Sequence, residues 1–447
     1  MLVIIHGWSD NFSSFRALAK RLASPLPDGI GAQVEQIYLG DYISLDDQVT
    51  FADLVEAMDR AWTDAGLPRS PRSVDAVVHS TGGLVIRDWL SRFPPDQVPI
   101  HRLLMLAPAN FGSPLAHTGR SVIGRAVKGW KGSRLFETGT QILKGLELAS
   151  SYSWQLAERD LFVDNSVFAP GRVLCTVLVG NAGYSGIAAV ANKPGTDGTV
   201  RVSTANLQAA RMLIDFSHEP GGAPRIDYQQ VDDSALAFTM VDGEDHSSIT
   251  AKGRGTNESI TWSLICGALM VPDSGFDAWR MRLASHCHQV SEVAAQRPGD
   301  HFQRYQNTVF RVLDNHGAPV NDYIIELYVN DDRTTRERRL TQVIQEEVIK
   351  GVHVFSGEKH YRSLLINCDL LYQLLLREQD RLRISITAYP EVSSGKVGYR
   401  TYTDDDIGAL SLSRAQVRDM FRPNRTLLIT LCLKRYQQAD VFRFKPV

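Results

Sequence analysis

Residues 77–83 read VVHSTGG and place a serine where an apolar run gives way to two glycines. The run that ends at His79 has the β-branched content of a buried strand, and residues 82–93 have the apolar spacing of a helix. A serine on such a sharp strand-to-helix turn exposes its Oγ atom, and small neighbours let the backbone double back closely. Ser80 is therefore a candidate nucleophile, and the N–H groups that begin the helix favour developing negative charge beside it.

The motif departs in one place from the G-x-S-x-G pattern, because Val78 occupies the position of the first glycine. That position still belongs to the predicted strand, where a β-branched residue is sterically acceptable. The alternative interpretation is that Ser80 is only a helix N-cap and that Gly82 and Gly83 serve helix packing.

A serine hydroxyl is a weak nucleophile unless a base takes its proton and an acid orients that base. Asp197 lies in the loop NKPGTDGTV after one predicted strand, and His246 lies in VDGEDHSSIT after another. The order serine, aspartate, histidine along the chain is that of the α/β-hydrolases. Asp197 alone would also suit a turn, and His246 is one of twelve histidines, so the assignment depends on the three residues together.

The polar residues beside these candidates have plainer interpretations. His79 should point away from Ser80, because side chains alternate along a strand. Asp242, Glu244 and Asp245 are alternative acids for the base, but they lie beside it in sequence, so we expect them to be solvated and to raise the pKa of His246 only modestly.

The tetrahedral intermediate of ester hydrolysis needs two backbone N–H donors, which form an oxyanion hole. One should belong to Thr81, directly after the candidate nucleophile. The other should belong to Trp8, in the loop HGWSD after the first predicted strand. The plain alternative for His6 and Gly7 is an ordinary strand-ending turn.

Short β-branched runs alternate with helical patterns up to about residue 270, which predicts an α/β fold with a mostly parallel, helix-covered sheet. The expected strands are 2–5, 34–38, 74–79, 102–106, 173–179 and 237–240. Residues 271–301 read as a connecting segment, and from residue 302 apolar and polar residues alternate between turn signals. We therefore expect a catalytic domain over 1–270 and an antiparallel β-rich domain over 302–447.

The 447 residues carry a net charge of −2, so the chain lacks the basic excess of a dedicated nucleic-acid binder. Five scattered cysteines without a C-x-x-C pair predict reduced thiols. His286 and His288 have no clear partner pair for a metal, and we expect neither a metal nor a cofactor. No signal peptide or membrane-spanning stretch is evident, so we expect any membrane contact to be peripheral.

Together these motifs resemble the lipase and esterase branch of the α/β-hydrolases, with LVIIHGW, VVHSTGG, LLMLAPANFGSPLA, GTDGTVRVSTA and DHSSI in the usual order. That resemblance implies a sheet without the first two strands of the fold. With its β-rich C-terminal part, the sequence further resembles the bacterial PlaB-type phospholipases, which release fatty acids from glycerophospholipids and lysophospholipids. The resemblance implies that Ser80, Asp197 and His246 form a catalytic triad. It also implies binding to a phospholipid membrane surface, homo-oligomers such as tetramers, and dependence on the C-terminal domain.

Residues 115–165 lie between two predicted strands and are expected to form an insertion over the site. Within it, RSVIGRAVKGWKGSRLF carries apolar residues at helical spacing among five basic residues, as in a membrane-interface helix or a lid. Trp130 and Phe136 are the candidate substrate contacts in this segment. An ordinary cap helix with solvated lysines fits the same pattern.

Other functions stay open on the sequence alone. The same triad would serve a soluble carboxylesterase or a triglyceride lipase, or would pass the acyl group to an alcohol. A membrane-binding assembly module on an inactive hydrolase scaffold would need no triad, and the presence of all three residue types argues against it. Aromatic and basic residues near predicted strand ends of the C-terminal part suit a lipid headgroup, a subunit contact or a plain β-core.

Overall fold

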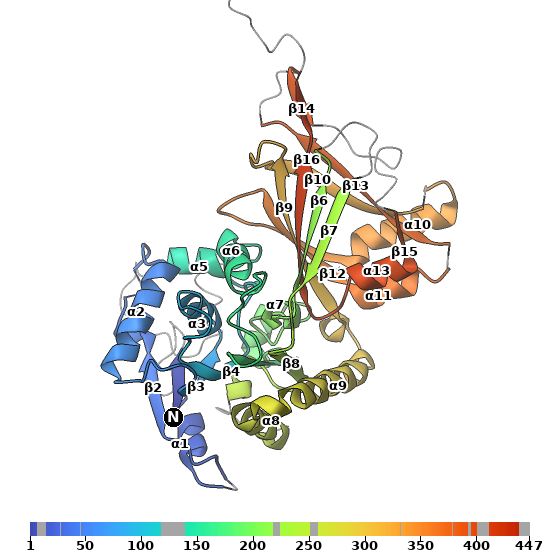
Figure 1. Ribbon diagram of the computed structural model, residues 1–447. Coiled ribbons are helices and arrows are strands. Elements are labelled where there is room, and N and C mark those ends of the chain that lie inside the picture. Colours follow the sequence, from blue (N-terminus) through green and yellow to red (C-terminus); the bar gives the residue numbers. More distant parts are fainter. Residues whose placement is uncertain are drawn as a thin grey trace, which may run out of the picture. The chain divides into compact units, whose positions relative to one another are not determined.

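The computed structural model (Figure 1) describes residues 1–6, 15–26, 28–44, 46–117, 139–217, 224–250, 258–330, 332–377, 379–391, 395–399 and 411–437. The chain divides into two compact units by its internal contacts. The first unit comprises Met1–Gln208 and Val231–Gln303, and the second comprises Ala209–Gln230 and Arg304–Val447. None of the helices within the described ranges is long and apolar enough to cross a membrane.

A six-stranded sheet in which every pair of neighbours is parallel forms the centre of the first unit. Its spatial order is β2-β1-β3-β4-β5-β8, and all six predicted strands are confirmed to within one or two residues. The strands are β1 (Leu2–His6), β2 (Val34–Tyr38), β3 (Val74–His79), β4 (Ile100–Leu106), β5 (Leu174–Gly180) and β8 (Leu236–Val241). Most of their residues are buried, as expected when helices cover both faces of a sheet.

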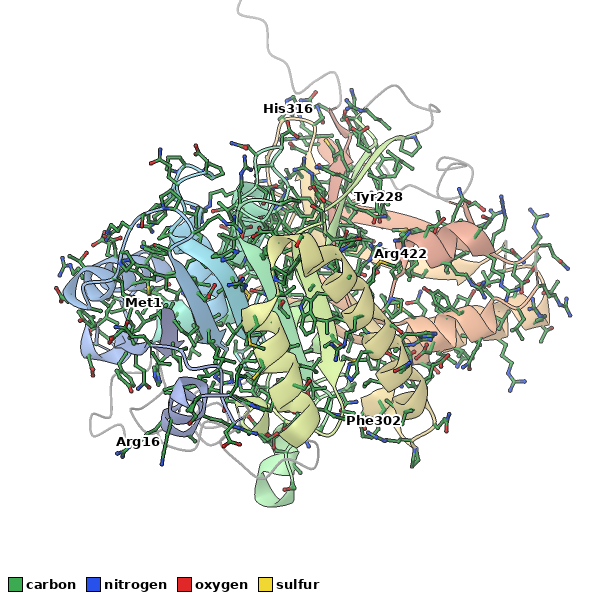
Figure 2. All side chains as sticks on the ribbon, turned by 60° about the horizontal axis from the view of Figure 1, so that its bottom comes forward. Met1, Arg16, Tyr228, Phe302, His316 and Arg422 are labelled. Atoms are coloured by element: carbon green, nitrogen blue, oxygen red, sulfur yellow. The ribbon has the colours of Figure 1, made fainter. Side chains whose placement is uncertain are left out.

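Helices surround this sheet: α1 (Arg16–Ala23), α2 (Phe51–Asp64), α3 (Gly82–Leu90), α5 (Thr140–Leu146), α6 (Ser151–Asp160), α7 (Val202–Ala205), α8 (Glu258–Met270) and α9 (Phe276–Ala295). All nine residues of α3 are buried, because α3 packs against β3, α2 and α6. Helix α8 packs against β4 and α9 against β8, and Figure 2 shows these two helices, in yellow, in front of the strands. The helix that follows Ser80 is therefore enclosed in the hydrophobic core of the unit.

A mixed sheet of order β11-β12-β9-β16-β6-β7 forms most of the second unit. Its strands are β6 (Ala210–Asp215), β7 (Arg225–Gln230), β9 (Tyr305–Asp314), β11 (Ile349–Val354), β12 (Tyr361–Asn367) and β16 (Thr426–Leu433). Strand β16 pairs in parallel with both β9 and β6, and the other neighbours are antiparallel.

The remaining elements of the second unit cover this sheet or extend from it. An antiparallel sheet is formed by β10 (Asp322–Val329), β13 (Arg381–Tyr389) and β15 (Ser411–Ser413), and β14 (Val397–Tyr399) pairs with β17 (Arg435–Gln437). The helices are α10 (Thr335–Val343), α11 (Cys368–Leu374) and α13 (Arg414–Met420). Leu382, Leu427 and Ile429 are fully buried members of the core between these elements.

Three features differ from the sequence-based expectation. Strands β6 and β7 belong to the second unit although they precede residue 270, and Figure 1 shows them in green among orange and red strands. The expected connecting segment 271–301 contains the 20-residue helix α9 and belongs to the first unit. The β-rich part is also not purely antiparallel, because β6 and β9 flank β16 in parallel. Apolar patterning identifies a strand but not its partner in space, so it could not reveal this pairing.

Candidate active site

Ser80 lies directly after β3 in the left-handed region of backbone space, with φ of +54°. This conformation costs a non-glycine residue roughly 1–2 kcal/mol, so neighbouring contacts must hold it. The Ser80 N–H donates to the Leu106 carbonyl at 3.2 Å, and the Ser80 carbonyl accepts from the N–H groups of Gly83 at 3.1 Å and Ala109 at 3.2 Å. The backbone at the predicted sharp turn is therefore fixed by β4 and by the loop that follows it.

The two glycines after Ser80 have unequal roles. A Cβ atom on Gly83 would lie 2.7 Å from Pro108 Cβ and 3.3 Å from Asn110 Oδ1. A Cβ atom on Gly82 would meet nothing closer than Val78 Cβ at 3.6 Å, an ordinary contact. Close packing therefore requires glycine at position 83. Val78 is fully buried within β3, where a β-branched residue is well accommodated, so the motif tolerates a valine in place of its first glycine.

The structure brings Ser80, Asp197 and His246 together from three separate loops. The Nε2 atom of His246 lies 3.1 Å from Ser80 Oγ, and its Nδ1 atom lies 3.0 Å from Asp197 Oδ2. The backbone N–H of His246 also donates to the Asp197 carbonyl at 2.8 Å. With a carboxylate accepting from Nδ1–H, the neutral imidazole has its lone pair on Nε2, where it faces the serine hydroxyl.

Asp197 is fully buried and held by the backbone of its own turn. Its Oδ1 atom accepts from the N–H groups of Thr199 at 2.9 Å and Val200 at 2.8 Å. Oδ2 is thereby left to face His246. These hydrogen bonds fix the carboxyl group in the position from which Oδ2 can orient the histidine.

Tyr184 is a component of the site that sequence reasoning missed. Gly198 has φ of +99°, and a Cβ atom there would lie 2.7 Å from the Tyr184 ring. The Tyr184 hydroxyl forms a 2.7 Å hydrogen bond with Thr199 Oγ1, and burial followed by the charge of Asp197 raises the pKa of Tyr184. The tyrosine therefore packs on the Asp197 turn as a neutral ring, and the glycine after Asp197 makes room for it.

His79 also contributes more to the site than its sequence position indicated. Its Nε2–H donates to the backbone carbonyl of His246 at 2.9 Å, and the two ring centroids lie 4.6 Å apart. Phe15 packs edge-on against the His79 ring, with the two centroids 5.5 Å apart. Strand alternation predicted only that His79 faces away from Ser80. It could not show that the loop carrying His246 passes over His79.

Glu244 is buried, which corrects the expectation that the acidic residues beside His246 are solvated, whereas Asp242 and Asp245 are half-buried. Glu244 is 1% exposed, and it accepts hydrogen bonds from Thr261 Oγ1 at 2.6 Å and from Ser248 Oγ. The Oδ1 atom of Asp245 accepts from the N–H groups of Ser247 and Ser248, each at 2.8 Å. These carboxylates satisfy donors within and next to the loop, a pattern that residue type alone does not reveal.

Asp242 lies at the start of the loop that carries His246 and holds it in place through hydrogen bonds. Both of its carboxylate oxygens accept from Arg297, at 2.8 and 2.6 Å, and Asn181 Nδ2 donates to it at 2.8 Å. Burial alone would raise the pKa of Asp242. The hydrogen bonds from Arg297 and Asn181, together with the charge of Arg297, outweigh this effect and lower the pKa. The charged form of Asp242 is therefore the one that the fold stabilises.

A buried ion pair supports the helix that follows Ser80. Arg87 on α3 and Asp160 on α6 are both fully buried and form two hydrogen bonds of 2.7 and 2.9 Å. Arg87 Nη1 also donates to the Asn110 carbonyl at 3.1 Å, and Asn110 Nδ2 donates to the Ala205 carbonyl at 2.8 Å. These bonds connect α3 to the loop after β4 and to the segment that follows Asp197.

Of the two predicted oxyanion donors, only Thr81 lies in the described part of the chain. It is 7% exposed and occupies the N-cap of α3, and none of the hydrogen bonds among the described residues uses its N–H. Trp8 lies outside the described residues, as do Trp130 and Phe136. Residues 139–165 of the expected insertion are described, and α6 within them packs against α3.

Within the described ranges, no three His, Cys, Asp or Glu side chains form a group that could hold a metal. His286 Nδ1 lies 2.9 Å from Thr239 Oγ1, and His288 Nε2 lies 3.4 Å from Glu292. These two histidines therefore have separate partners.

No protein-family model matches the sequence, and no curated protein matches it. Two solved structures of phospholipase PlaB from Legionella pneumophila are similar to the chain over its full length. The complex with thio-NAD has a TM-score of 0.81 at 25% identity, and the other structure has a TM-score of 0.80 at 24% identity. Each match covers 100% of this chain and 96% of that chain.

Lipase BlEst2 from Bacillus licheniformis is also similar, with a TM-score of 0.33 and 17% identity over 59% of this chain and 91% of that chain. The similarity to phospholipase PlaB along the whole chain, together with the parallel central sheet, confirms the predicted α/β-hydrolase fold and the resemblance to that phospholipase.

Proposed function

We propose that this α/β-hydrolase is a serine hydrolase that releases fatty acids from glycerophospholipids and lysophospholipids through an acyl-enzyme at Ser80. The observation that carries the proposal is the continuous contact from Ser80 Oγ to His246 Nε2 at 3.1 Å and from His246 Nδ1 to Asp197 at 3.0 Å. A serine, a base and an orienting acid in this geometry are what acyl transfer requires. The likeness to phospholipase PlaB supports the choice of a phospholipid substrate.

In the first half-reaction, Ser80 Oγ attacks the carbonyl carbon of the ester while His246 Nε2 takes the hydroxyl proton. The imidazolium then gives that proton to the leaving alkoxide, and the lysolipid departs. In the second half-reaction a water molecule loses a proton to His246 and attacks the carbonyl carbon of the acyl-enzyme. The bond between that carbon and Ser80 Oγ then breaks, the imidazolium returns the proton to Ser80 Oγ, and the fatty acid is released. Asp197 holds Nδ1–H throughout and stabilises the imidazolium.

The tetrahedral intermediates of both steps place negative charge on the former carbonyl oxygen. We assign one donor to this oxyanion, the Thr81 N–H at the N-terminus of α3. Trp8 remains the proposed second donor, and Trp130 and Phe136 remain the proposed contacts of the acyl chain. Removal of one oxyanion donor typically costs about 10²–10³-fold in rate.

A phospholipid substrate resides in a membrane, so the proposal includes peripheral binding to a phospholipid surface. It also includes assembly of the chain into homo-oligomers, tetramers among them. Both features rest on the resemblance to the phospholipases and are tested by vesicle co-sedimentation and by measurement of the mass in solution.

The decisive experiment is mass spectrometry of the products from mixed phospholipid vesicles. Ser80→Ala should abolish release of free fatty acid and leave the unfolding midpoint and vesicle binding unchanged. The matched control is Ser70→Ala, at an exposed serine of the same unit, and it should keep wild-type activity. Fatty-acid release by the Ser80→Ala protein would overturn the proposal.

Comparison of substrates separates phospholipid hydrolysis from the other uses of the same triad. If the wild-type protein cleaves short p-nitrophenyl esters and triglycerides but no phospholipid or lysophospholipid, the substrate assignment is wrong and the serine chemistry stands. Failure of Ser80 to react with a fluorophosphonate probe would indicate an inactive scaffold.

A further inference from the structure

Arg425 in the second unit is a buried cation without a counter-ion among the described residues. It directly precedes β16 and is 7% exposed. Its Nη2 atom donates to the Tyr228 hydroxyl at 2.8 Å and to the Asp419 carbonyl at 3.3 Å. Its Nε atom is buried and has no hydrogen-bond acceptor in the described part of the chain. All the described acceptors are uncharged, and they use only one of the three guanidinium nitrogens.

Other arginines in this protein show how the fold ordinarily compensates such a charge. Arg87, which is fully buried, has both oxygens of Asp160 within hydrogen-bond distance. Arg304, in the same unit as Arg425, pairs with Asp369 at 2.6 Å. An isolated charge removed from water is strongly unfavourable unless an opposite charge accompanies it. The described surroundings of Arg425 therefore lack the negative charge that a buried arginine needs.

Another arginine adds positive charge near Arg425. Arg422 lies near Arg425, and its own partner is the exposed carboxylate of Asp419, at 3.6 Å. Burial lowers the pKa of the Arg425 guanidinium, Tyr228 opposes this, and Arg422 lowers it further. The guanidinium and hydroxyl groups of these side chains are the donors that usually bind oxyanions.

We propose that Arg425, Tyr228 and Arg422 form a binding site for a phosphate group in the second unit. A phosphate carries close to two negative charges near neutral pH and presents three acceptor oxygens. It would supply the counter-ion that Arg425 lacks and accept from the guanidinium N–H groups that have no partner, and its second charge would attract Arg422, whose own partner, the exposed Asp419, lies at 3.6 Å. The proposal is independent of the chemistry at Ser80, since every residue in it belongs to the second unit.

The phosphate group has two possible sources with the same chemistry: a small soluble phosphate, or the headgroup of a phospholipid. Inorganic phosphate and glycerol 3-phosphate test the first source. Vesicles of phosphatidic acid in phosphatidylcholine, with pure phosphatidylcholine as the reference, test the second.

The experiment uses the full chain and its Arg425→Gln variant, which keeps a polar side chain of similar reach and removes the charge. The matched control is Arg225→Gln, because Arg225 lies on the same strand as Tyr228 and its side chain is 63% exposed. The unfolding midpoint and the calorimetric binding heat are measured against low-millimolar phosphate, with potassium chloride at equal ionic strength. Vesicle flotation is measured with the same three proteins.

Phosphate or glycerol 3-phosphate should raise the unfolding midpoint of the wild type and the Arg225→Gln protein, and chloride should not, because a ligand stabilises the state that binds it. Arg425→Gln should remove the phosphate-dependent rise, and Tyr228→Phe should weaken it. If only flotation on phosphatidic acid vesicles depends on Arg425, the phosphate group is that of a lipid.

The proposal is overturned if neither readout distinguishes Arg425→Gln from Arg225→Gln. It is equally overturned if Arg425→Gln lowers the unfolding midpoint by the same amount with and without phosphate. That result would mean that Arg425 only clamps Tyr228 and the Asp419 carbonyl.

Discussion

The ring of His79 holds the main chain of His246: its Nε2–H donates to the His246 carbonyl at 2.9 Å, and the ring centroids are 4.6 Å apart. A carbonyl oxygen only accepts, so this contact fixes the proton of the neutral His79 ring on Nε2. His79 is thus a positioning residue that acts through the proposed base, and it can be tested separately from the triad.

Replacement of His79 should lower kcat and leave KM unchanged, because His79 orients His246. Loss of one hydrogen bond is worth about 0.5–1.5 kcal/mol, so His79→Asn and His79→Phe should lose about 3–10-fold in kcat. His79→Gln should recover most of the rate, since its amide nitrogen reaches nearly as far as Nε2, whereas the asparagine nitrogen does not. The measurements are kcat and KM for ester hydrolysis and the rate of fluorophosphonate labelling at Ser80.

The labelling rate also separates this role from a merely structural one. A structural role would lower the unfolding midpoint of the Gln and Asn variants alike and would show no rescue by Gln. Equal labelling rates in the wild type and the Asn variant would refute the positioning role. A wild-type protein that does not label at all would instead refute the proposed serine chemistry.

Asp197→Asn should leave the fold intact and lower kcat by about 10⁴-fold, because an amide that donates to Nδ1 selects the wrong tautomer of His246. The unfolding midpoint should change little, since the asparagine oxygen can still accept from the N–H groups of Thr199 and Val200. Ester hydrolysis per labelled active site is the measurement. A rate within tenfold of the wild type would mean that another acid orients His246.

Gly83→Ala and Gly82→Ala form a matched pair on α3. A methyl group at position 83 would lie 2.7 Å from Pro108 Cβ, so overpacking should cost about 1–3 kcal/mol and displace Ser80. A methyl group at position 82 finds an ordinary contact of 3.6 Å, so that variant should be about as stable as the wild type. Chemical unfolding and labelling of Ser80 compare the two. If the two alanine variants are equally stable and label at equal rates, the packing argument is wrong.

Asp242→Asn should make the protein less stable at neutral pH, and this loss of stability should diminish progressively as the pH falls below about 4. Arg297 and Asn181 lower the pKa of Asp242 against the opposing effect of burial. A carboxyl whose pKa is lower in the folded state contributes stability that is present above the unfolded pKa and is lost as the pH falls through the folded pKa.

The measurement is the free energy of unfolding of the wild type and of Asp242→Asn from pH 3 to 7, an interval that spans the ordinary pKa of aspartate, about 3.9. The difference between the two proteins should shrink toward the acid end. A difference that does not vary with pH would show that Asp242 acts without its charge.

The sequence alone was sufficient to predict the strands of the central sheet and the polar residues that follow them. The strands of the central sheet are short and almost wholly apolar, so their positions followed from composition. Ser80, Asp197 and His246 were predictable because each follows a strand, and parallel strands bring their carboxyl ends to one edge of the sheet.

The remaining contacts depend on tertiary structure. Nothing in VVHSTGG shows that the His79 ring meets the His246 carbonyl, and nothing in VDGEDHSSIT distinguishes buried Glu244 from a solvated acid. The partners are 167 residues apart for His79 and 17 residues apart for Glu244 with Thr261. Arg425 is similar, because its burial depends on the hairpin of β6 and β7, which lies far earlier in the chain.

That hairpin has a practical consequence for any attempt to divide the protein. A chain cut after residue 303 retains β6 and β7 but deletes β16, the parallel neighbour of β6. The orphaned strand would present unpaired backbone groups and an apolar side, the surface from which aggregation starts. Loss of activity on such a truncation would therefore reveal nothing about what the deleted part does, and an informative deletion must remove the hairpin as well.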